Sequence, residues 1–252
     1  MNTQIADLET YTIRMNRGMM DKLFFVDKID ADLIVDYGCA TGDLLSHVAS
    51  WFPNATLIGY DIDQEMLALT KTINNCTFTD VWPKSFPTFG KKALVLSSIL
   101  HELYHYKDHT QIESFWEQIL GSEFDYLVIR DMMPSRSVNR PSHINDVARV
   151  YQTFLNSKEL QDFENIWGTI EDNRNLLHFL LKYRYHTPNW EREVRENYIP
   201  IYREDLLSMI PKCYRIIYHE HYVLPYIQRT IREDVGVELK DPTHLKIILE
   251  RV

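Results

Sequence analysis

The sequence predicts an α/β fold with a doubly wound, mostly parallel sheet. Short apolar runs alternate with helical stretches along most of the chain, an order that builds parallel sheets through right-handed crossovers. The run 33–37 is followed by a tight Gly-x-x-x-Gly turn at Gly38 and Gly42. A second run, 56–60, leads directly into Asp61. Strand, glycine turn, helix, strand and acid form the first half of a nucleotide-type α/β fold.

The individual elements follow from apolar runs and helix stops. Continuous apolar runs are typical of strands covered on both faces, and we expect them at 33–37, 56–60, 76–79, 93–98, 126–130, 214–218 and 244–249. Helices are expected at 43–51, 63–74, 109–120, 203–209 and 225–235, with Gly121 a natural stop for the third. The first 30 residues, among them Tyr11, Ile13, Met15 and Met19, are expected to be helical and amphipathic. Such a leader either covers the cofactor site or simply packs on the core, and simple packing is favoured.

The pattern changes after residue 131. Residues 132–202 carry several prolines, few β-rich runs and many aromatic and arginine side chains, which indicates a helical insertion after the fifth strand. The expected division is therefore 1–30 as a helical leader, 31–131 as the α/β core, 132–202 as an insertion or substrate lid, and 203–252 as the rest of the core. Most insertion aromatics are expected to be core residues, and 190–196 is expected to be a solvated helix with mixed charge pairs.

Composition narrows the class of protein. The chain has 252 residues, a net charge of −9 and three cysteines without a Cys-x-x-Cys pair, so neither a disulfide framework nor a zinc ribbon is indicated. No apolar run approaches the roughly 20 residues of a membrane span, and no signal peptide is seen. A cytoplasmic protein is expected, and the oligomeric state is not indicated. The negative charge argues against affinity based on phosphate neutralisation.

The glycine turn does not suit a phosphate. A dinucleotide site would have glycine where Ala40 and Asp43 stand, and a carboxylate beside the helix N-terminus would repel a pyrophosphate. No Gly-Lys-Ser/Thr follows, which excludes a P-loop. A ligand without phosphate fits better: adenosine with a zwitterionic amino-acid tail that carries a sulfonium.

The stretch resembles the class I S-adenosylmethionine-dependent methyltransferases. Their first motif matches residues 35–42 and their second matches residues 59–63, and the resemblance covers roughly residues 30–131 with a weaker match in the last 50. It implies a Rossmann-like methyltransferase fold whose seven-stranded sheet has one antiparallel member. It also implies S-adenosyl-L-methionine as the cofactor of the core 31–131.

The resemblance assigns roles within the cofactor site. It implies that Asp36 faces the cofactor's α-amino group and that Asp61 holds the ribose hydroxyls. The other residues that it implies are Gly38, Cys39 and Gly42 for the methionine moiety, Ile62, Asp80 and Val81 for the adenine, and Ser97 at the end of the fourth strand. The alternative is that the glycines only serve a tight turn and that Asp61 is a strand-end cap.

His101, Glu102 and His105 match the His-Glu-x-x-His pattern of zinc proteases. The motif follows a parallel strand, where α/β folds place ligands, so a zinc hydrolase is only a remote alternative. In the first methyltransferase hypothesis, His101 is a general base that Glu102 or a neighbour orients. In the second, the three residues hold a divalent metal, as in the partly similar small-RNA 2′-O-methyltransferases. In the third, they only pack or face solvent. We expect no metal.

The predicted activity is methyl transfer to a small-molecule acceptor by in-line displacement, with His105, Arg130 and Trp190 as substrate-binding residues. Arg130 and Asp131 end the fifth strand and are expected to point into the same cleft. Residues 97–100 lack an Asn-Pro-Pro-Tyr-type motif, which disfavours exocyclic amines and leaves oxygen, carboxylate, ring-nitrogen and carbon acceptors. The alternatives are an RNA or nucleotide acceptor, stacked on insertion aromatics, a non-catalytic binding protein, and a hydrolase or lyase acting on the cofactor.

Overall fold

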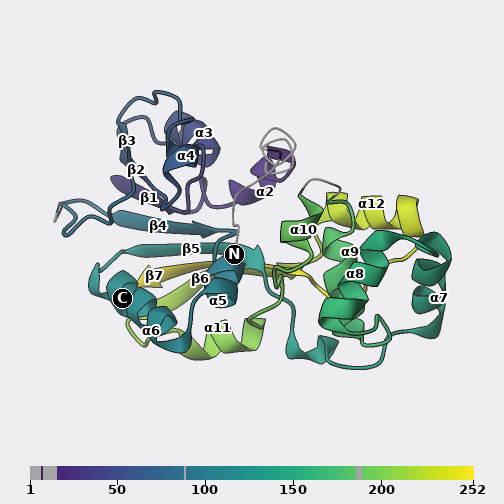
Figure 1. Cartoon of the computed structure of the whole chain (residues 1–252). Helices are drawn as coiled ribbons and strands as arrows, with labels where there is room; N and C mark the ends of the chain where they lie inside the picture. The colour runs from purple at the N-terminus through teal and green to yellow at the C-terminus, as the bar shows by residue number, and fades with distance from the viewer. Residues whose placement is uncertain (1–6, 8–15, 88, 186–188) are drawn as a thin grey trace. The chain divides into compact units, whose positions relative to one another are not determined.

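A computed structural model describes residues 7, 16–87, 89–185 and 189–252, and Figure 1 labels its elements. A seven-stranded sheet has the order β3-β2-β1-β4-β5-β7-β6. The strands are β1 (Leu33–Tyr37), β2 (Thr56–Tyr60), β3 (Cys76–Thr79), β4 (Lys92–Ser97), β5 (Tyr126–Met132), β6 (Tyr214–Tyr222) and β7 (His244–Arg251). All seven predicted strands are confirmed, and β5, β6 and β7 run two to four residues further than expected.

The sheet is parallel from β3 through β5. Strand β7 runs the other way: beyond its final residues, the amide of Val252 donates to the carbonyl of Cys213, just before β6 begins. At the same end, the amide of Arg251 donates to the carbonyl of Asp125, just before β5. Opposite chain directions therefore meet on both sides of β7. The predicted mostly parallel, seven-stranded α/β fold with one antiparallel member is confirmed.

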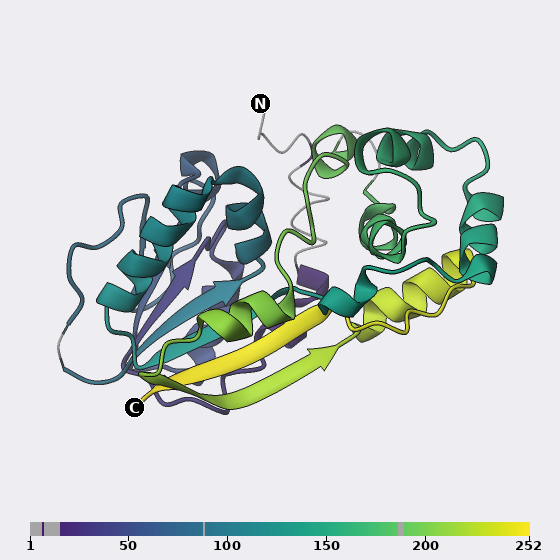
Figure 2. The same cartoon turned by 90° about the horizontal axis from the view of Figure 1, so that it is seen from below.

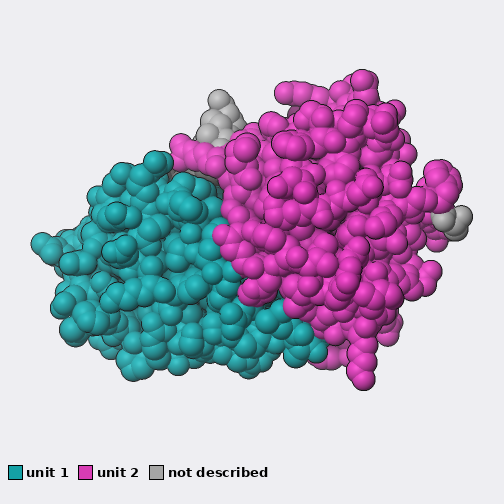
Figure 3. Space-filling model, turned by 180° about the vertical axis from the view of Figure 1, so that it is seen from behind, with its two compact units in different colours: residues 1–12, 132–209, 221–245 teal, residues 13–131, 210–220, 246–252 magenta. Residues whose placement is uncertain are grey.

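The chain forms two compact units, coloured separately in Figure 3. Unit 1 comprises residues 1–12, 132–209 and 221–245, and unit 2 comprises residues 13–131, 210–220 and 246–252. The four-part division expected from the sequence remains a prediction. Among the described residues, no helix combines the length and the apolar character that a membrane crossing requires.

Unit 2 contains α2 (Met19–Lys22), α3 (Asp43–Trp51), α4 (Gln64–Leu67), α5 (Leu100–Tyr106) and α6 (His109–Gly121). Helices α3 and α6 have the predicted bounds within one residue, and Figure 2 shows α5 and α6 on one side of the strands. Helix α6 begins in a capping box, in which Asp108 accepts a hydrogen bond from the amide of Gln111. The side chain of Gln111 in turn accepts a hydrogen bond from the backbone amide of Asp108. Each side chain thus pairs with a backbone amide that the start of a helix leaves without a partner.

Helix α4 is much shorter than the predicted 63–74. Asp63 caps its start by accepting hydrogen bonds from the amides of Glu65 and Met66, but the helix ends at Leu67. The residues that follow include Thr70, Thr72 and Ile73, whose branched Cβ atoms lower helix propensity. Strand β3 begins at Cys76, so the residues before it must connect the helix to the sheet.

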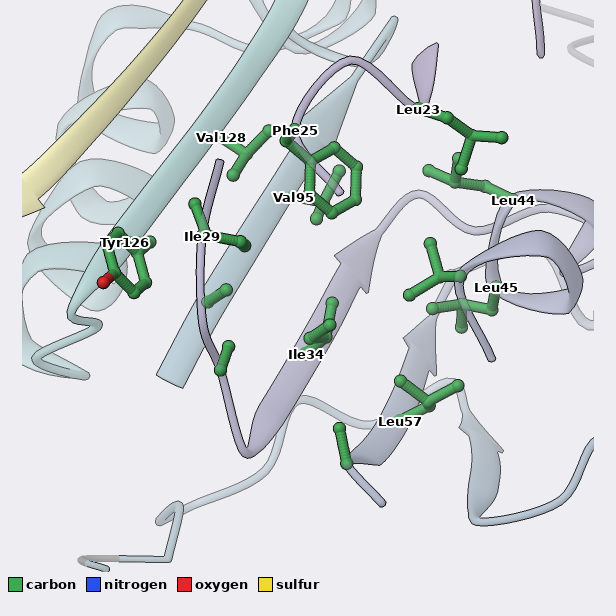
Figure 4. Packing of buried hydrophobic residues seen from close by; sticks show 14 of the residues in the cluster. Leu23, Phe25, Ile29, Ile34, Leu44, Leu45, Leu57, Val95, Tyr126 and Val128 are labelled. Atoms are coloured by element: carbon green, nitrogen blue, oxygen red, sulfur yellow. The ribbon is translucent and has the colours of Figure 1, made fainter. Parts of the chain in front are cut away.

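The core of unit 2 lies between the sheet and the N-terminal segment. Leu44 and Leu45 of α3, Ile34 of β1, Val95 of β4 and Val128 of β5 converge on it, as Figure 4 shows. The N-terminal segment adds buried side chains that include Met19, Leu23 and Phe25.

The expected packing of the leader on the core is confirmed for these three residues. The expected helical character is wrong for residues 23–28, because α2 ends at Lys22 and these residues form turns. Tyr11, Ile13 and Met15 lie outside the described residues.

Unit 1 is mostly helical, as predicted for the insertion. It holds a 3₁₀ turn (Arg136–Val138) and the helices α7 (Ile144–Thr153), α8 (Lys158–Trp167), α9 (Asn173–Lys182), α10 (Trp190–Glu193), α11 (Arg203–Met209) and α12 (Pro225–Val235). Its own hydrophobic cluster includes Phe163, Phe179, Tyr183 and Trp190. These aromatic side chains are therefore core residues.

The charged segment 190–196 is not the solvated helix that its composition suggests. Glu193 and Glu196 are each 2% exposed, and Arg192 forms ion pairs with both. The ammonium of Lys182 donates to the backbone carbonyls of these two glutamates, at 2.8 and 2.5 Å. The mixed charge pairs exist, but they lie inside unit 1, and burial lowers the pKa of Lys182 to about 7.

Candidate active site

The glycine turn joins β1 to α3 in a conformation that glycine favours. Gly38 has φ +78° and Gly42 has φ +77°, the left-handed region in which a Cβ is strained. A Cβ on Gly38 would lie 2.7 Å from a methyl of Ile99, and one on Gly42 would lie 2.6 Å from the ring of Phe78. The need for glycine thus includes packing against two side chains, a role that the sequence argument missed.

Asp61 joins the second strand to this turn. One carboxylate oxygen accepts a hydrogen bond from the amide of Ala40 at 2.7 Å, and the other accepts from the amide of Asp63 at 2.9 Å. Burial raises the pKa of Asp61 despite these bonds. Each carboxylate oxygen has a second lone pair, so the group is oriented by the backbone and retains acceptor capacity for two vicinal hydroxyls.

The residues assigned to the adenine follow β2 and β3. The side chains of Ile62 and Val81 are 76% and 66% exposed, unusual for apolar residues beside a sheet edge. Asp80 accepts a hydrogen bond from the side-chain amide of Gln64 at 2.6 Å. Exposed apolar side chains beside a carboxylate form a surface that a flat, partly polar base could cover. The role of these residues in adenine binding stays a prediction.

Asp36 and Ser97 are polar residues near the carboxyl ends of β1 and β4. Because side chains alternate along a strand, Asp36 shares the face of the core residue Ile34, and Ser97 shares that of Val95. Asp36 is 3% exposed, and burial raises its pKa to about 7. The Ser97 hydroxyl is buried and has no hydrogen-bond partner within the described part of the chain. A buried hydroxyl without a partner is costly, which indicates a ligand at this edge.

Cys39 occupies the turn between Gly38 and Ala40. It is 5% exposed, and its thiol lies 3.8 Å from the carbonyl of Ala40. Burial raises the pKa of the thiol above its usual value. The side chain is therefore a small neutral group in the turn, compatible with a backbone that approaches a ligand.

His101 is held by an acid that the motif does not contain. Its Nδ1 lies 2.7 Å from one oxygen of Asp131, and the other oxygen accepts hydrogen bonds from the amides of Leu100 and His101 at 2.7 and 3.3 Å. His101 is 5% exposed and Asp131 is fully buried. Two backbone donors favour the ionised carboxylate, which can only accept, so in the neutral ring the proton lies on Nδ1 and Nε2 carries the lone pair.

His101 and Glu102 lie close together, with a carboxylate oxygen within 4.8 Å of a ring nitrogen, but His105 does not join them. Among the described residues, the three members of the motif therefore do not form a three-ligand group. The ring of His105 packs at 4.3 Å from that of Tyr106. The carboxylate that contacts Nδ1 belongs to Asp131. From the sequence, Asp131 could be recognised as an acid at a strand end, but its contact with His101 could not.

The two other substrate candidates have structural partners. The guanidinium of Arg130 donates to Asp21 at 2.9 Å and to the hydroxyl of Ser98 at 2.8 Å. Trp190 is 3% exposed in the core of unit 1, and its indole N–H donates to Asp162. Both side chains stabilise their own units in this structure, and their predicted contact with substrate stays a prediction.

These residues fit the cofactor that the sequence implies. A cationic amine would face Asp36, a diol would face Asp61, and the unpartnered Ser97 hydroxyl would meet a polar group of the amino-acid tail. Exposed Ile62 and Val81 offer apolar contact for a base. The set has carboxylates where a phosphate would need donors, in agreement with S-adenosylmethionine.

Comparisons with known proteins agree with this fold and with a methyltransferase domain. Residues 34–122 match the model of a family described as a methyltransferase domain. A solved structure of the plantazolicin methyltransferase BpumL, in complex with a pentazolic desmethylPZN analog and SAH, is 14% identical with a TM-score of 0.54, covering 96% of this chain and 88% of that one.

A second similar structure is a putative O-methyltransferase from Nostoc punctiforme PCC 73102. It is 11% identical with a TM-score of 0.51, and the match covers 96% of this chain and 58% of that one. No curated protein sequence matches the chain. The family match covers β1 to β4 and the turn at Gly38 and Gly42, so residues 34–122 form an S-adenosylmethionine-dependent methyltransferase domain, and the fold is that of the class I methyltransferases.

Proposed function

We propose that the chain methylates a small-molecule acceptor and that His101 removes a proton from the attacking hydroxyl or ring N–H. The observation that carries this proposal is the 2.7 Å contact between His101 Nδ1 and the fully buried carboxylate of Asp131. A buried acid that holds one nitrogen of an imidazole selects the tautomer in which the other nitrogen accepts a proton.

The chain's residues then have separate tasks. When bound, the cofactor supplies a methyl group on a sulfonium, open to in-line displacement. Asp36 and Asp61 orient the cofactor, and alignment of the reactants can supply roughly 7–11 kcal/mol of the barrier. His101 takes the acceptor's proton, an effect of roughly 10²–10⁴-fold. Asp131 stabilises the imidazolium that results, because its carboxylate already lies against Nδ1.

A small acceptor is favoured over RNA by the state of the insertion's arginines. RNA binding needs cations that can reach phosphates, and the chain has a net charge of −9. Within unit 1, four arginines already contact acids or backbone oxygens: Arg149, Arg174, Arg184 and Arg192. The aromatic side chains that might stack bases are largely core residues. Both observations support a neutral or cationic small molecule.

A similar fold is known to hold a modified peptide. The solved BpumL structure contains a desmethylPZN analog together with SAH. At 14% identity this likeness concerns the fold. We include azole-containing peptides, phenols, carboxylic acids and ring-nitrogen heterocycles in the acceptor screen because they match the atoms that the sequence leaves open.

The test is transfer of a radiolabelled methyl group from S-adenosylmethionine to fractionated acceptors. We expect label in small-molecule pools, with a rate that is insensitive to salt. Label confined to RNA, with a rate that falls steeply as salt rises, would contradict the small-molecule proposal. Turnover unchanged in His101→Gln would contradict the role of His101 as base. His109→Gln, which alters an exposed histidine ion-paired with Glu113, serves as the matched control.

A further inference from the structure

Lys22 of α2 is buried at the polar edge of unit 2. It is 6% exposed and lies between two core residues of the same short helix region, Met19 and Leu23. Charged groups from three other elements act on its ammonium: Asp36 of β1, Asp43 of α3, and Arg130 with Asp131 of β5. Burial of a lysine ammonium is costly, and it is stabilised by opposite charges and hydrogen-bond acceptors from the protein or from a ligand.

The position of this lysine is set by its neighbour. Asp21 forms an ion pair with Arg130 at 2.9 Å and with Lys246 of β7 at 2.6 Å. These contacts tie α2 to the ends of two strands, and the packing of Met19 and Leu23 fixes the helix from the other side. The charges of Lys22 and Asp36 act on each other, and Asp36 pairs in register with Val95, two residues before the unpartnered Ser97 hydroxyl.

A buried cation beside a buried acid is the complement of an amino-acid zwitterion. We propose that Lys22 binds the α-carboxylate of the cofactor's methionine moiety, while Asp36 binds its ammonium and Ser97 adds a hydrogen bond. The two sequence motifs at residues 35–42 and 59–63 contain no residue of the N-terminal segment. The proposal rests on cofactor binding and is independent of the acceptor and of His101.

The charge states agree with this assignment near neutral pH. Burial, with a smaller contribution from Arg130, lowers the pKa of Lys22 to about 8. Burial also raises the pKa of Asp36 to about 7. Between these two values both groups are charged in a large fraction of molecules, and a ligand with one opposite charge for each would compensate the desolvation that shifts them.

The test compares three ligands on the full chain by isothermal titration without acceptor. S-adenosylmethionine has both charges of the tail, its decarboxylated form keeps only the ammonium, and 5′-methylthioadenosine has neither. We expect Lys22→Met to weaken S-adenosylmethionine binding by roughly 10- to 100-fold, the range of a hydrogen bond to a charged group. Binding of the other two ligands should change little. Lys28→Met removes a charge from the same segment, where Lys28 pairs with Asp27, and should change none of the three.

The outcomes separate this proposal from the activity itself. Equal weakening of S-adenosylmethionine and its decarboxylated form in Lys22→Met would overturn it, because the lysine would then act only on the fold or on Asp36. Absence of binding to the wild-type chain would contradict the methyltransferase assignment as well. If Lys22→Met does not fold, judged by thermal unfolding, Lys22→Gln takes its place. A wild-type chain that binds both sulfonium ligands equally well also overturns the proposal.

Discussion

Replacement of Asp131 by asparagine tests the link between the fold and the proposed base. Helix α5 begins after Ile99, which provides no side-chain cap. The cap comes instead from β5, because one oxygen of Asp131 accepts hydrogen bonds from the first two amides of the helix. The other oxygen contacts His101 Nδ1. Asparagine keeps the size but has one oxygen and one NH₂ group.

The expected result follows from which atom of the asparagine meets which partner. If the oxygen caps the helix, the NH₂ group faces His101 Nδ1, and the ring must carry its proton on Nε2. That tautomer cannot accept a proton from the acceptor, so kcat should fall by roughly 10²–10⁴-fold. Loss of the charge at the helix N-terminus costs about 0.3–1 kcal/mol. The weakened hydrogen bonds bring the loss in unfolding free energy to about 1–3 kcal/mol.

Two assays follow Asp131→Asn. Imidazole ¹⁵N NMR reports the tautomer of His101 without any acceptor, with the signal assigned from His101→Gln. Urea unfolding reports the stability. Asp108→Asn is the matched control, because Asp108 caps α6 in the same way without contacting a histidine in that cap. It should lower stability comparably and leave the tautomer and the rate unchanged. A His101 ring that keeps its proton on Nδ1 in Asp131→Asn, with an unchanged rate, would refute the reasoning.

Three further predictions concern stability. Gly42→Ala combines a left-handed φ with a Cβ 2.6 Å from the ring of Phe78, and should cost about 2–4 kcal/mol in urea unfolding. Gly121→Ala, with no atom within 4 Å of the new Cβ, should be neutral or stabilising. Burial lowers the pKa of Lys182 to about 7, so between pH 7 and the ordinary lysine value the unfolded chain binds more protons. Wild type should therefore gain stability over Lys182→Met as pH rises through this window, by at most about 1.4 kcal/mol per pH unit. Although burial opposes it, hydrogen bonds from a serine hydroxyl and a backbone amide lower the pKa of Glu204 to about 2. The stability advantage of wild type over Glu204→Gln should persist above pH 4.5 and vanish as pH falls toward 2, as acid unfolding curves would show; an advantage that stays constant with pH would contradict it.

The sheet could be predicted because its signals are local. The runs 33–37, 56–60 and 76–79 become β1, β2 and β3 with the expected bounds. The reason is clearest for β1, which is buried over four of its five residues, because a strand covered on both faces needs continuous apolar sequence. The turn glycines and Asp61 were found because strand ends and turns restrict residue types within a few positions. Helix α4 was overestimated for a local reason too, namely that β-branched residues after Leu67 weigh against a helix that the apolar spacing favours.

The side chains that complete the site are set by tertiary contacts. Asp131 is 30 residues from His101 in the sequence, and only the pairing of β4 with β5 brings them together. Lys22 looks like a polar residue of an amphipathic leader, and its burial depends on the ion pairs of Asp21. In unit 1, Glu193 is buried in an ion pair with Arg192, and the ammonium of Lys182 donates to its backbone carbonyl. No spacing rule within one segment could show any of these three.

Isothermal titration with S-adenosylhomocysteine is the most direct test of the cofactor site. We predict one saturable site per chain, lost in Asp61→Ala and retained in Asp27→Ala, which removes an exposed acid paired with Lys28. Thermal unfolding would check that both variants fold. Absence of binding to the wild-type chain, or equal binding by Asp61→Ala, would contradict the cofactor site described for the turn between β1 and α3.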